Sequence, residues 1–173
     1  ASGSVVVGPD ETISSIDAIT GSIVVEGTVT GDISGVAGDV RIDGVVEGNV
    51  ELASGDVDIY GDVGGDVSVG AGNVRIHDGA VIGGDFSTGA GIVVVDGTIA
   101  GDARIGAETI RLGEQASIGG SLAYDGTLEG DVDAVVAGDV TRDRSLSVGL
   151  IDDLQPFIEW VFTVNIFLLN LLF

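Results

Sequence analysis

The chain has 173 residues, a formal net charge of −22 at pH 7 and no cysteine, which excludes disulfides, thiolate metal sites and a cysteine nucleophile. Its six basic residues are all arginine, so a lysine-dependent phosphate loop cannot form and nucleotide binding is not expected. An acidic field of this size also repels nucleic acid, whose binding depends on basic side chains that neutralise phosphates.

High acidity without lysine resembles the composition of proteins from extreme halophiles. In molar salt the Debye length falls to roughly 3 Å, so repulsion between the carboxylates is screened. We therefore predict a halophilic protein, with an ordinary acidic surface protein as the alternative. The composition, with 45% hydrophobic residues, 30 glycines and 2 prolines, favours one domain of short strands and tight turns.

The chain begins with Ala1-Ser2-Gly3, the kind of small residues that remain after signal-peptide cleavage, although an artificial start would look the same. Two short apolar stretches follow, at 4–7 and 13–16. We interpret the first as the opening strand of the repeat described next. No polar capping repeat precedes it in this sequence.

Glycines recur with a period of 17 to 19 residues along the chain. One series marks Gly-Asp-like steps, and a second series with the same period marks another corner. The first series is Gly31, Gly48, Gly65, Gly84, Gly101 and Gly120, and the second is Gly21, Gly38, Gly55, Gly72, Gly91 and then Glu108. Gly at such corners permits positive φ and close backbone approach, and Asp or Asn can form an Asx turn.

Four apolar columns keep the same period, and they begin at Ile23, Val25, Val29 and Ile33. The first two columns lie two residues apart, as the inward-facing positions of a strand do. No stretch before about Arg144 has a sustained helical period. The sequence therefore predicts an all-β fold, a right-handed parallel β-helix of about six to seven coils, in a domain over 1–144.

The repeat is irregular in three places. Two repeats are lengthened at His77-Asp78 and at Gly113–Ser117, where we expect outward loops. After Leu122 the glycine motif returns at 126–132, where Gly130 follows Gly120 of the first series by only ten residues, so we expect a shortened final coil.

The motif G-x-V-x-G-D-V, alternating with G-D-V-x-I-x-G, resembles the bactofilin family of polymer-forming cytoskeletal proteins. The resemblance covers roughly 21–140 and is carried by the stretches at 29–33, 38–44, 46–50, 55–61, 63–67 and 99–103. It implies a right-handed, triangular β-helix that polymerises end to end into non-polar filaments without nucleotide. Such filaments commonly lie on a membrane and act as scaffolds.

Residues with possible chemistry are few. The recurring acidic residue of the Gly-Asp steps could bind calcium, but Asn49 and Ser121 replace it in places and no second carboxylate keeps a fixed offset, so turn formation is favoured. His77 is the only histidine, which favours a loop residue over a catalytic base. Phe86 replaces Val in an apolar column, either filling the core or contacting a partner. We predict no enzyme, no cofactor and no metal.

The ends of a solenoid expose strand edges and an unshielded core. We expect them to stack on further copies of the same chain, which is the predicted partner, through isologous contacts if like ends meet. The residues predicted to form the polymerising ends are Val5, Val6, Val7, Ile13, Ile16, Val135, Val136 and Val140.

The last part of the chain, 145–173, reads as a linker and an apolar helix with a possible start near Asp153 and Pro156. The run from Trp160 is fourteen residues, short of the roughly twenty that span a bilayer, so we predict a truncated transmembrane helix. An in-plane anchor and a helix packed on the rod are the alternatives. The predicted membrane residues are Phe157, Trp160, Phe162, Ile166, Phe167, Leu168 and Leu169.

Acidic residues flank the apolar run, which favours a β-helix outside the cell membrane, with the cytoplasmic face as the alternative. The sequence as a whole predicts a membrane-associated structural protein that assembles end to end and binds neither nucleic acid nor nucleotide. A binding module that uses a flat face of the β-helix is the second hypothesis. A β-helix enzyme of the acyltransferase type is the third.

Overall fold

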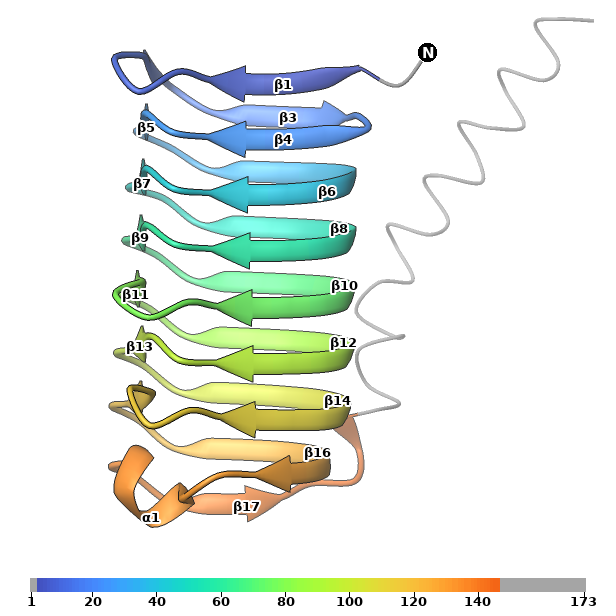
Figure 1. Cartoon of the computed structure of the whole chain (residues 1–173), viewed down its shortest axis with the longest axis vertical. Helices are drawn as coiled ribbons and strands as arrows, with labels where there is room; N and C mark the ends of the chain where they lie inside the picture. Colours follow the sequence, from blue (N-terminus) through green and yellow to red (C-terminus); the bar gives the residue numbers. More distant parts are fainter. Residues whose placement is uncertain (1–2, 147–173) are drawn as a thin grey trace, which may run out of the picture.

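The computed structural model describes residues 3–146 and is an all-β parallel solenoid of about eight turns with a 17-residue period (Figure 1). The predicted fold class is therefore confirmed, with more turns than the six to seven expected. The predicted apolar helix and its membrane residues lie outside the described residues. Within the described part of the chain, no helix has the length and apolar character needed to cross a membrane.

Each regular coil contains one long strand and one two-residue strand. The long strands are β6 (Ile33–Ile42), β8 (Val50–Ile59), β10 (Val67–Ile76), β12 (Phe86–Val95) and β14 (Ala103–Leu112). The short strands are β5 (Thr28–Val29), β7 (Val45–Val46), β9 (Asp62–Val63), β11 (Val81–Ile82), β13 (Thr98–Ile99) and β15 (Ser117–Ile118).

The end coils depart from this pattern. The chain enters through β1 (Ser4–Val7), β2 (Thr12–Ile13), β3 (Ile16–Ile19) and β4 (Ser22–Val25). It leaves through β16 (Leu122–Glu129), the single helical turn α1 (Val132–Val135) and β17 (Val140–Arg142).

The solenoid has three faces, each a stack of parallel strands. β6 pairs with β3 through Ile33–Val36 and with β4 through Asp39–Ile42, so one long strand serves two faces and curves between them (Figure 1). We call the stack of β3 and the N-terminal halves of the long strands the first face. The second face comprises β1, β4 and the C-terminal halves, and the two-residue strands form the third face in a seven-stranded sheet.

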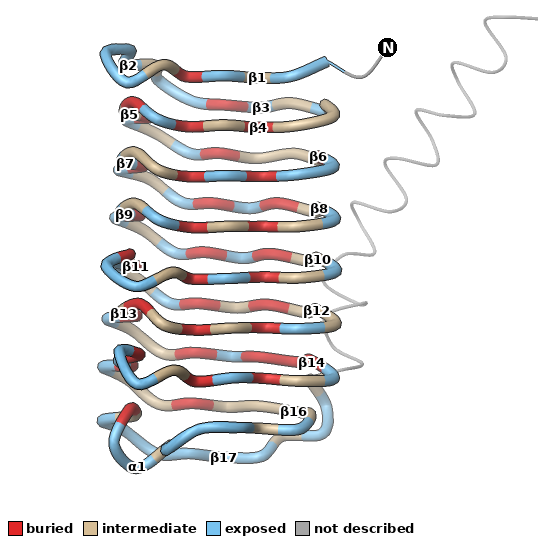
Figure 2. Tube along the Cα trace, viewed as in Figure 1, coloured by how far each residue is buried: buried red, intermediate tan, exposed pale blue. Residues whose placement is uncertain are grey.

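The core is made of residues in identical positions on successive coils. Val40, Val57 and Val74 are in register on the second face, and all are buried. The same holds for the columns that contain Val25, Val29 and Ile33, so all four predicted columns are confirmed. Buried and less buried positions alternate in both halves of long strands such as β8 and β10, as Figure 2 shows.

One buried column was not predicted. Leu52, Val69, Thr88 and Ile105 lie in register on the first face and are buried. Thr88 is the one buried polar residue among 3–146, and its Oγ1 donates a 2.8 Å hydrogen bond to the carbonyl of Val69. This bond lets a hydroxyl occupy the core without an unsatisfied polar atom.

Phe86 lies fully buried in the fourth predicted column, with Val67 on one side and Ala103 on the other. The small Ala103 side chain leaves room for the large ring in the neighbouring coil, which is how a close-packed core tolerates one oversized residue. The interpretation of Phe86 as a core residue is confirmed, and the alternative of a contact with a partner is wrong.

The lengthened coils have their additional residues where the sequence predicted them, between the second and third faces. Each addition forms a turn, with the N–H of Ala80 donating to the carbonyl of His77 (3.1 Å) and the N–H of Ala116 donating to that of Gly113 (3.2 Å). The strands on either side stay in register, because the turns project from one corner.

The prediction of a shortened final coil is wrong. The residues 127–129 pair with Thr109–Arg111 on the second face, although their sequence repeats a motif that elsewhere leads to the third face. Gly138, rather than Gly130, continues the first glycine series, and its N–H donates to the carbonyl of Gly120 (2.9 Å). Short Gly-x-x-x-Gly segments thus occur on different faces of the solenoid, so this motif alone does not fix the register of the final coil.

Candidate interaction surfaces of the solenoid

The Gly-Asp steps form a continuous ladder of side-chain hydrogen bonds along one corner of the solenoid. In each coil the side-chain oxygen accepts a bond from the backbone N–H of the equivalent residue in the next coil. The pairs are Asp32 with Asn49 N–H (2.7 Å), Asn49 with Asp66, Asp66 with Asp85, Asp85 with Asp102 and Asp102 with Ser121 (each 2.8 Å), and Ser121 with Asp139 (3.3 Å). We call this series the Asx ladder.

The Asx ladder explains why glycine precedes each acidic residue. A Cβ placed at Gly84 would overlap Oδ1 of Asp66 and come within 2.8 Å of the Gly65 carbonyl oxygen. None of the glycines of this series has a positive φ. Of the two properties expected of glycine at these corners, positive φ is not used in this series, whereas close approach between coils is confirmed.

The ladder also defines what these acidic side chains do. The expected Asx turn within one coil is replaced by a bond between coils, so one oxygen of each carboxylate already accepts a backbone N–H. Among residues 3–146 there is no group of three or more histidine or acidic side chains that could hold a metal ion. The arrangement therefore fits the predicted structural role of the Gly-Asp steps better than calcium binding.

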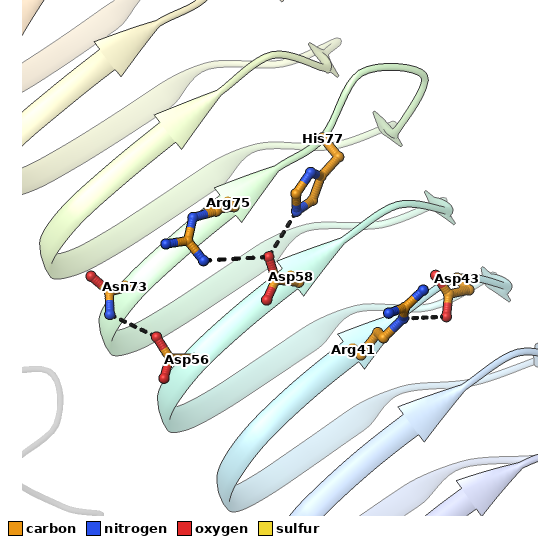
Figure 3. A network of polar contacts seen from close by, with 7 residues as sticks. All are labelled: Arg41, Asp43, Asp56, Asp58, Asn73, Arg75 and His77. Carbon is orange, nitrogen blue, oxygen red and sulfur yellow. Dashed lines mark hydrogen bonds and ion pairs between the residues drawn. The ribbon is translucent and has the colours of Figure 1, made fainter.

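A second polar ladder runs over the second face (Figure 3). Asp58 lies between Arg75 and His77, with its Oδ1 3.8 Å from Nη1 of Arg75 and 2.7 Å from Nε2 of His77. One coil away, Arg41 donates from Nε to Asp43 (2.6 Å), and this hydrogen bond raises the pKa of the Arg41 guanidinium. We call this group the charged ladder.

His77 starts the first inserted turn, as predicted, but its ring is held in the charged ladder. The ring stacks on Tyr60 with centroids 3.8 Å apart, and the guanidinium of Arg41 lies 4.7 Å from the centre of the Tyr60 ring. The stack of His77 on Tyr60 was not predicted, although the two residues lie 17 positions apart in the sequence. The repeat period would have revealed this stack, because residues 17 apart are ladder neighbours.

A shallow hollow lies near the last coils on the second face. Its lining includes Val94, Leu112 and the ion pair between Arg111 and Glu129 (2.9 Å). The hollow is open to solvent, and His77 does not line it. The only imidazole of the chain is thus separate from this concave surface.

At the N-terminal end, β1, β2 and β3 each pair on one side only. Of the predicted end residues, Val7 and Ile16 are buried, whereas Val5 and Ile13 are partly buried. Val6 is 57% exposed and belongs to the outward column of the second face. The structure therefore groups these residues in one coil, with Val6 pointing sideways rather than along the axis.

At the C-terminal end, α1 lies over the edge of the core. Val135 is buried and Val136 is partly buried in a single bridge to Ile118 on the third face. Val140 lies on β17 and is 41% exposed. Just beyond β17, Asp143 accepts hydrogen bonds from the hydroxyl and the N–H of Ser145, which lower the pKa of its carboxyl.

The chain was compared with family models, curated proteins and solved structures. No match was found in any of the three comparisons. The interpretation of the surfaces therefore depends on the geometry of the solenoid itself. The features that carry it are the Asx ladder, the charged ladder and the two unequal ends.

Proposed function

We propose that this protein is a non-enzymatic structural protein that self-assembles through the ends of its solenoid and forms a scaffold at a membrane. The observation that carries the proposal is the row of unpaired strand edges on β1, β2 and β3. Such edges are templates for pairing with another chain unless a helix, loop or charge protects them. A second copy of the same chain offers strands of matching length and spacing.

The regularity of the coils supports a structural role. Buried core residues run from Val7 in the first coil to Leu122 in β16, and the Asx ladder ties every coil between Asp32 and Asp139 to the next. A solenoid of this kind is a stiff rod, because each coil contacts only its neighbours through a continuous ladder. A stiff rod with unpaired strand edges at an end is well suited to assemble with further copies of itself.

The chemistry of the chain also supports this role. The solitary imidazole of His77 is paired with Asp58 and stacked on Tyr60, which supports a structural role for this side chain. Assembly without nucleotide follows from the missing lysine. Association with a membrane, with the solenoid on its outer side, rests on the apolar sequence from Phe157 and its acidic flank.

The proposal is tested on the full 173-residue chain in mild detergent. Analytical ultracentrifugation and electron microscopy at low and at molar salt should show end-to-end oligomers, without added nucleotide. Oligomers should have the width of a single solenoid and a multiple of its length. A chain that stays monomeric at every salt concentration would contradict the proposal.

The charged ladder supports a second candidate, a binding face for a polar partner. Its side chains are held in fixed positions by one another, so little side-chain entropy would be lost on binding. Replacing Arg75 and Arg41 with alanine should then abolish retention of the protein by acidic polysaccharide. Unchanged retention in both variants would exclude this candidate.

A further inference from the structure

We infer that the first coil is the self-association surface and that it binds the first coil of a second copy, so that assembly closes as a two-fold dimer. The inference rests on the proposed function and specifies which end acts and where growth stops. The last coil, in contrast, terminates the ladder. Five features of the two ends lead to this assignment.

The edge of β1 has backbone groups that are ready to pair. The carbonyls of Gly3 and Val7 accept bonds from the N–H groups of Gly21 and Glu26, so alternate residues of β1 face β4. Because backbone groups alternate in direction along a strand, the N–H and C=O of Val6 face the open end. β1 has neither a charged side chain nor a proline to protect this edge.

Apolar side chains are most exposed in the same coil. Among the exposed large hydrophobic residues of 3–146, Ile19 (67%) and Val6 (57%) have the highest exposure, and both belong to the first coil. In an antiparallel pair of β1 strands, Val6 of each copy would form cross-strand apolar contacts. The first coil thus combines free backbone groups with side chains that gain from being covered.

Head-to-tail stacking is prevented at the corner of the Asx ladder. Asp139 is the last member of the ladder, and the equivalent pair in the first coil is Ser14-Ser15. Wherever an aspartate or asparagine of the ladder accepts from the next coil, a glycine precedes the donor, because a Cβ there would overlap the side-chain oxygen. Ser14 carries that Cβ, so the ladder cannot continue from Asp139 into another copy.

One column of the first face ends at a charged residue in the last coil. Arg142 is in register with Tyr124, which is in register with Ile105 of the buried first-face column. The column that contains Ile105 therefore ends at an exposed arginine on the terminal strand, whereas Ala18 has the corresponding position in the first coil. Stacking any copy on the last coil would bury Arg142 at considerable cost.

The helical turn α1 adds a steric barrier at the same end. A helix is about 10 Å across, whereas stacked strands are about 4.8 Å apart. The third face is reduced to the single bridge between Ile118 and Val136 next to α1. The last coil thus lacks the flat, three-sided edge that end-to-end pairing requires.

Charge determines how the dimer depends on salt. A contact between two first coils brings together Asp10, Glu11 and Asp17 of both copies, and no basic residue lies between 3 and 40 to compensate. Screening by salt removes this repulsion. Dimerisation should therefore strengthen by about tenfold between 0.1 and 1 M salt, opposite to an interface held by ion pairs.

The first experiment uses the lack of cysteine in the chain. Val6→Cys and Val140→Cys each replace an exposed valine on the terminal strand of one end, Val6 in an outward column and Val140 in the column that continues from Leu122. Treatment with a short bis-maleimide should join Val6→Cys into a covalent dimer and leave Val140→Cys unjoined. Self-joining of Val140→Cys would overturn the inference. So would covalent products longer than a dimer from a chain that carries both Val6→Cys and Val140→Cys.

The second experiment uses proline to block each edge in turn. Val6→Pro removes an N–H that faces the open end and leaves the bonds between β1 and β4 intact, so circular dichroism should be unchanged. Dimerisation measured by ultracentrifugation should weaken by about 30-fold, since two-fold symmetry removes two interfacial bonds at once. Val140→Pro is the matched control at the other end and should dimerise like the unaltered chain.

The outcomes separate the inference from the proposed function. Filaments, or dimers that survive Val6→Pro, would contradict the inference and leave the proposed function standing. A chain that is monomeric in all variants and at all salt concentrations would contradict both.

Discussion

The coils from β6 to β14 follow the repeat closely, whereas the two end coils depart from it. In the middle, each coil has a glycine, an Asx acceptor and an apolar column in register, so every unpaired group of one coil is satisfied by the next. At the ends the same positions hold Ser14 or Arg142, and an edge remains. The repeat thus explains stability, whereas departures from the repeat define where the chain stops or associates.

The largest loss of stability is expected in the middle, at Phe86→Ala. Removing a buried ring beside Ala103 leaves a cavity that neighbouring coils cannot fill, and such changes typically cost about 3–5 kcal/mol. Denaturant unfolding followed by circular dichroism at constant salt measures the loss. The double variant Phe86→Val with Ala103→Val should recover most of it, and a loss below about 1 kcal/mol in Phe86→Ala would contradict the packing described here.

A slightly smaller loss is expected for Gly84→Ala, at about 3 kcal/mol, because the added methyl group overlaps Asp66 and the backbone of the previous coil. Gly79→Ala provides the contrast. Gly79 has a φ of +86° but no atom within 4 Å of an added Cβ, so only about 1 kcal/mol of backbone strain is expected. Equal losses in the two variants would show that conformation, not coil stacking, determines the glycine pattern.

Removing one member of the Asx ladder compares middle and end directly. Asp66→Ala leaves the N–H of Asp85 to water and should cost about 1 kcal/mol. Asp139→Ala should change stability by less than about 0.5 kcal/mol, since among residues 3–146 its carboxylate accepts no hydrogen bond from a further coil. Thermal unfolding of both variants at one salt concentration provides the test. Equal changes in stability for Asp66→Ala and Asp139→Ala would contradict a stabilising role of the Asx ladder.

The smallest effect is expected in the charged ladder. Asp58→Asn weakens the pairs with Arg75 and His77, whose side chains are partly exposed, so a loss of about 0.5 kcal/mol at low salt is expected. The loss should vanish at 1 M salt. Glu47→Gln is the control, because it removes one negative charge without breaking an ion pair. If Asp58→Asn lowers the free energy of unfolding more than Glu47→Gln does, and by the same amount at low and high salt, an electrostatic origin is contradicted.

Most of the fold was predictable because the sequence repeats with a nearly constant period. Each coil repeats the same contacts, so the positions of Gly84, Ile42 and the turn at His77 follow from counting residues. The buried first-face column was overlooked because its members are of mixed type, with Thr88 among them. The final coil was mispredicted because a short motif of glycine and valine fits two different faces equally well.

The candidate surfaces were only partly predictable. The sequence pointed to both ends and listed apolar residues there, but it could not distinguish Val7 and Val135, which are buried, from Val6, which is exposed. It also treated the two ends as equivalent. The difference depends on register at the last coil, where Arg142 meets a core column, and this register was not available from the repeat.

The sequence by itself determined the solenoid, its period, its core columns and the places of its inserted turns. These follow from local repetition, since identical coils have to make identical contacts. Only the tertiary structure decided that the acidic corner residues bond between coils, that the glycines of this corner serve close approach and not positive φ, and that the two ends differ. Those properties depend on which atoms of neighbouring coils meet, and residues 17 positions apart meet only once the chain has wound around its core.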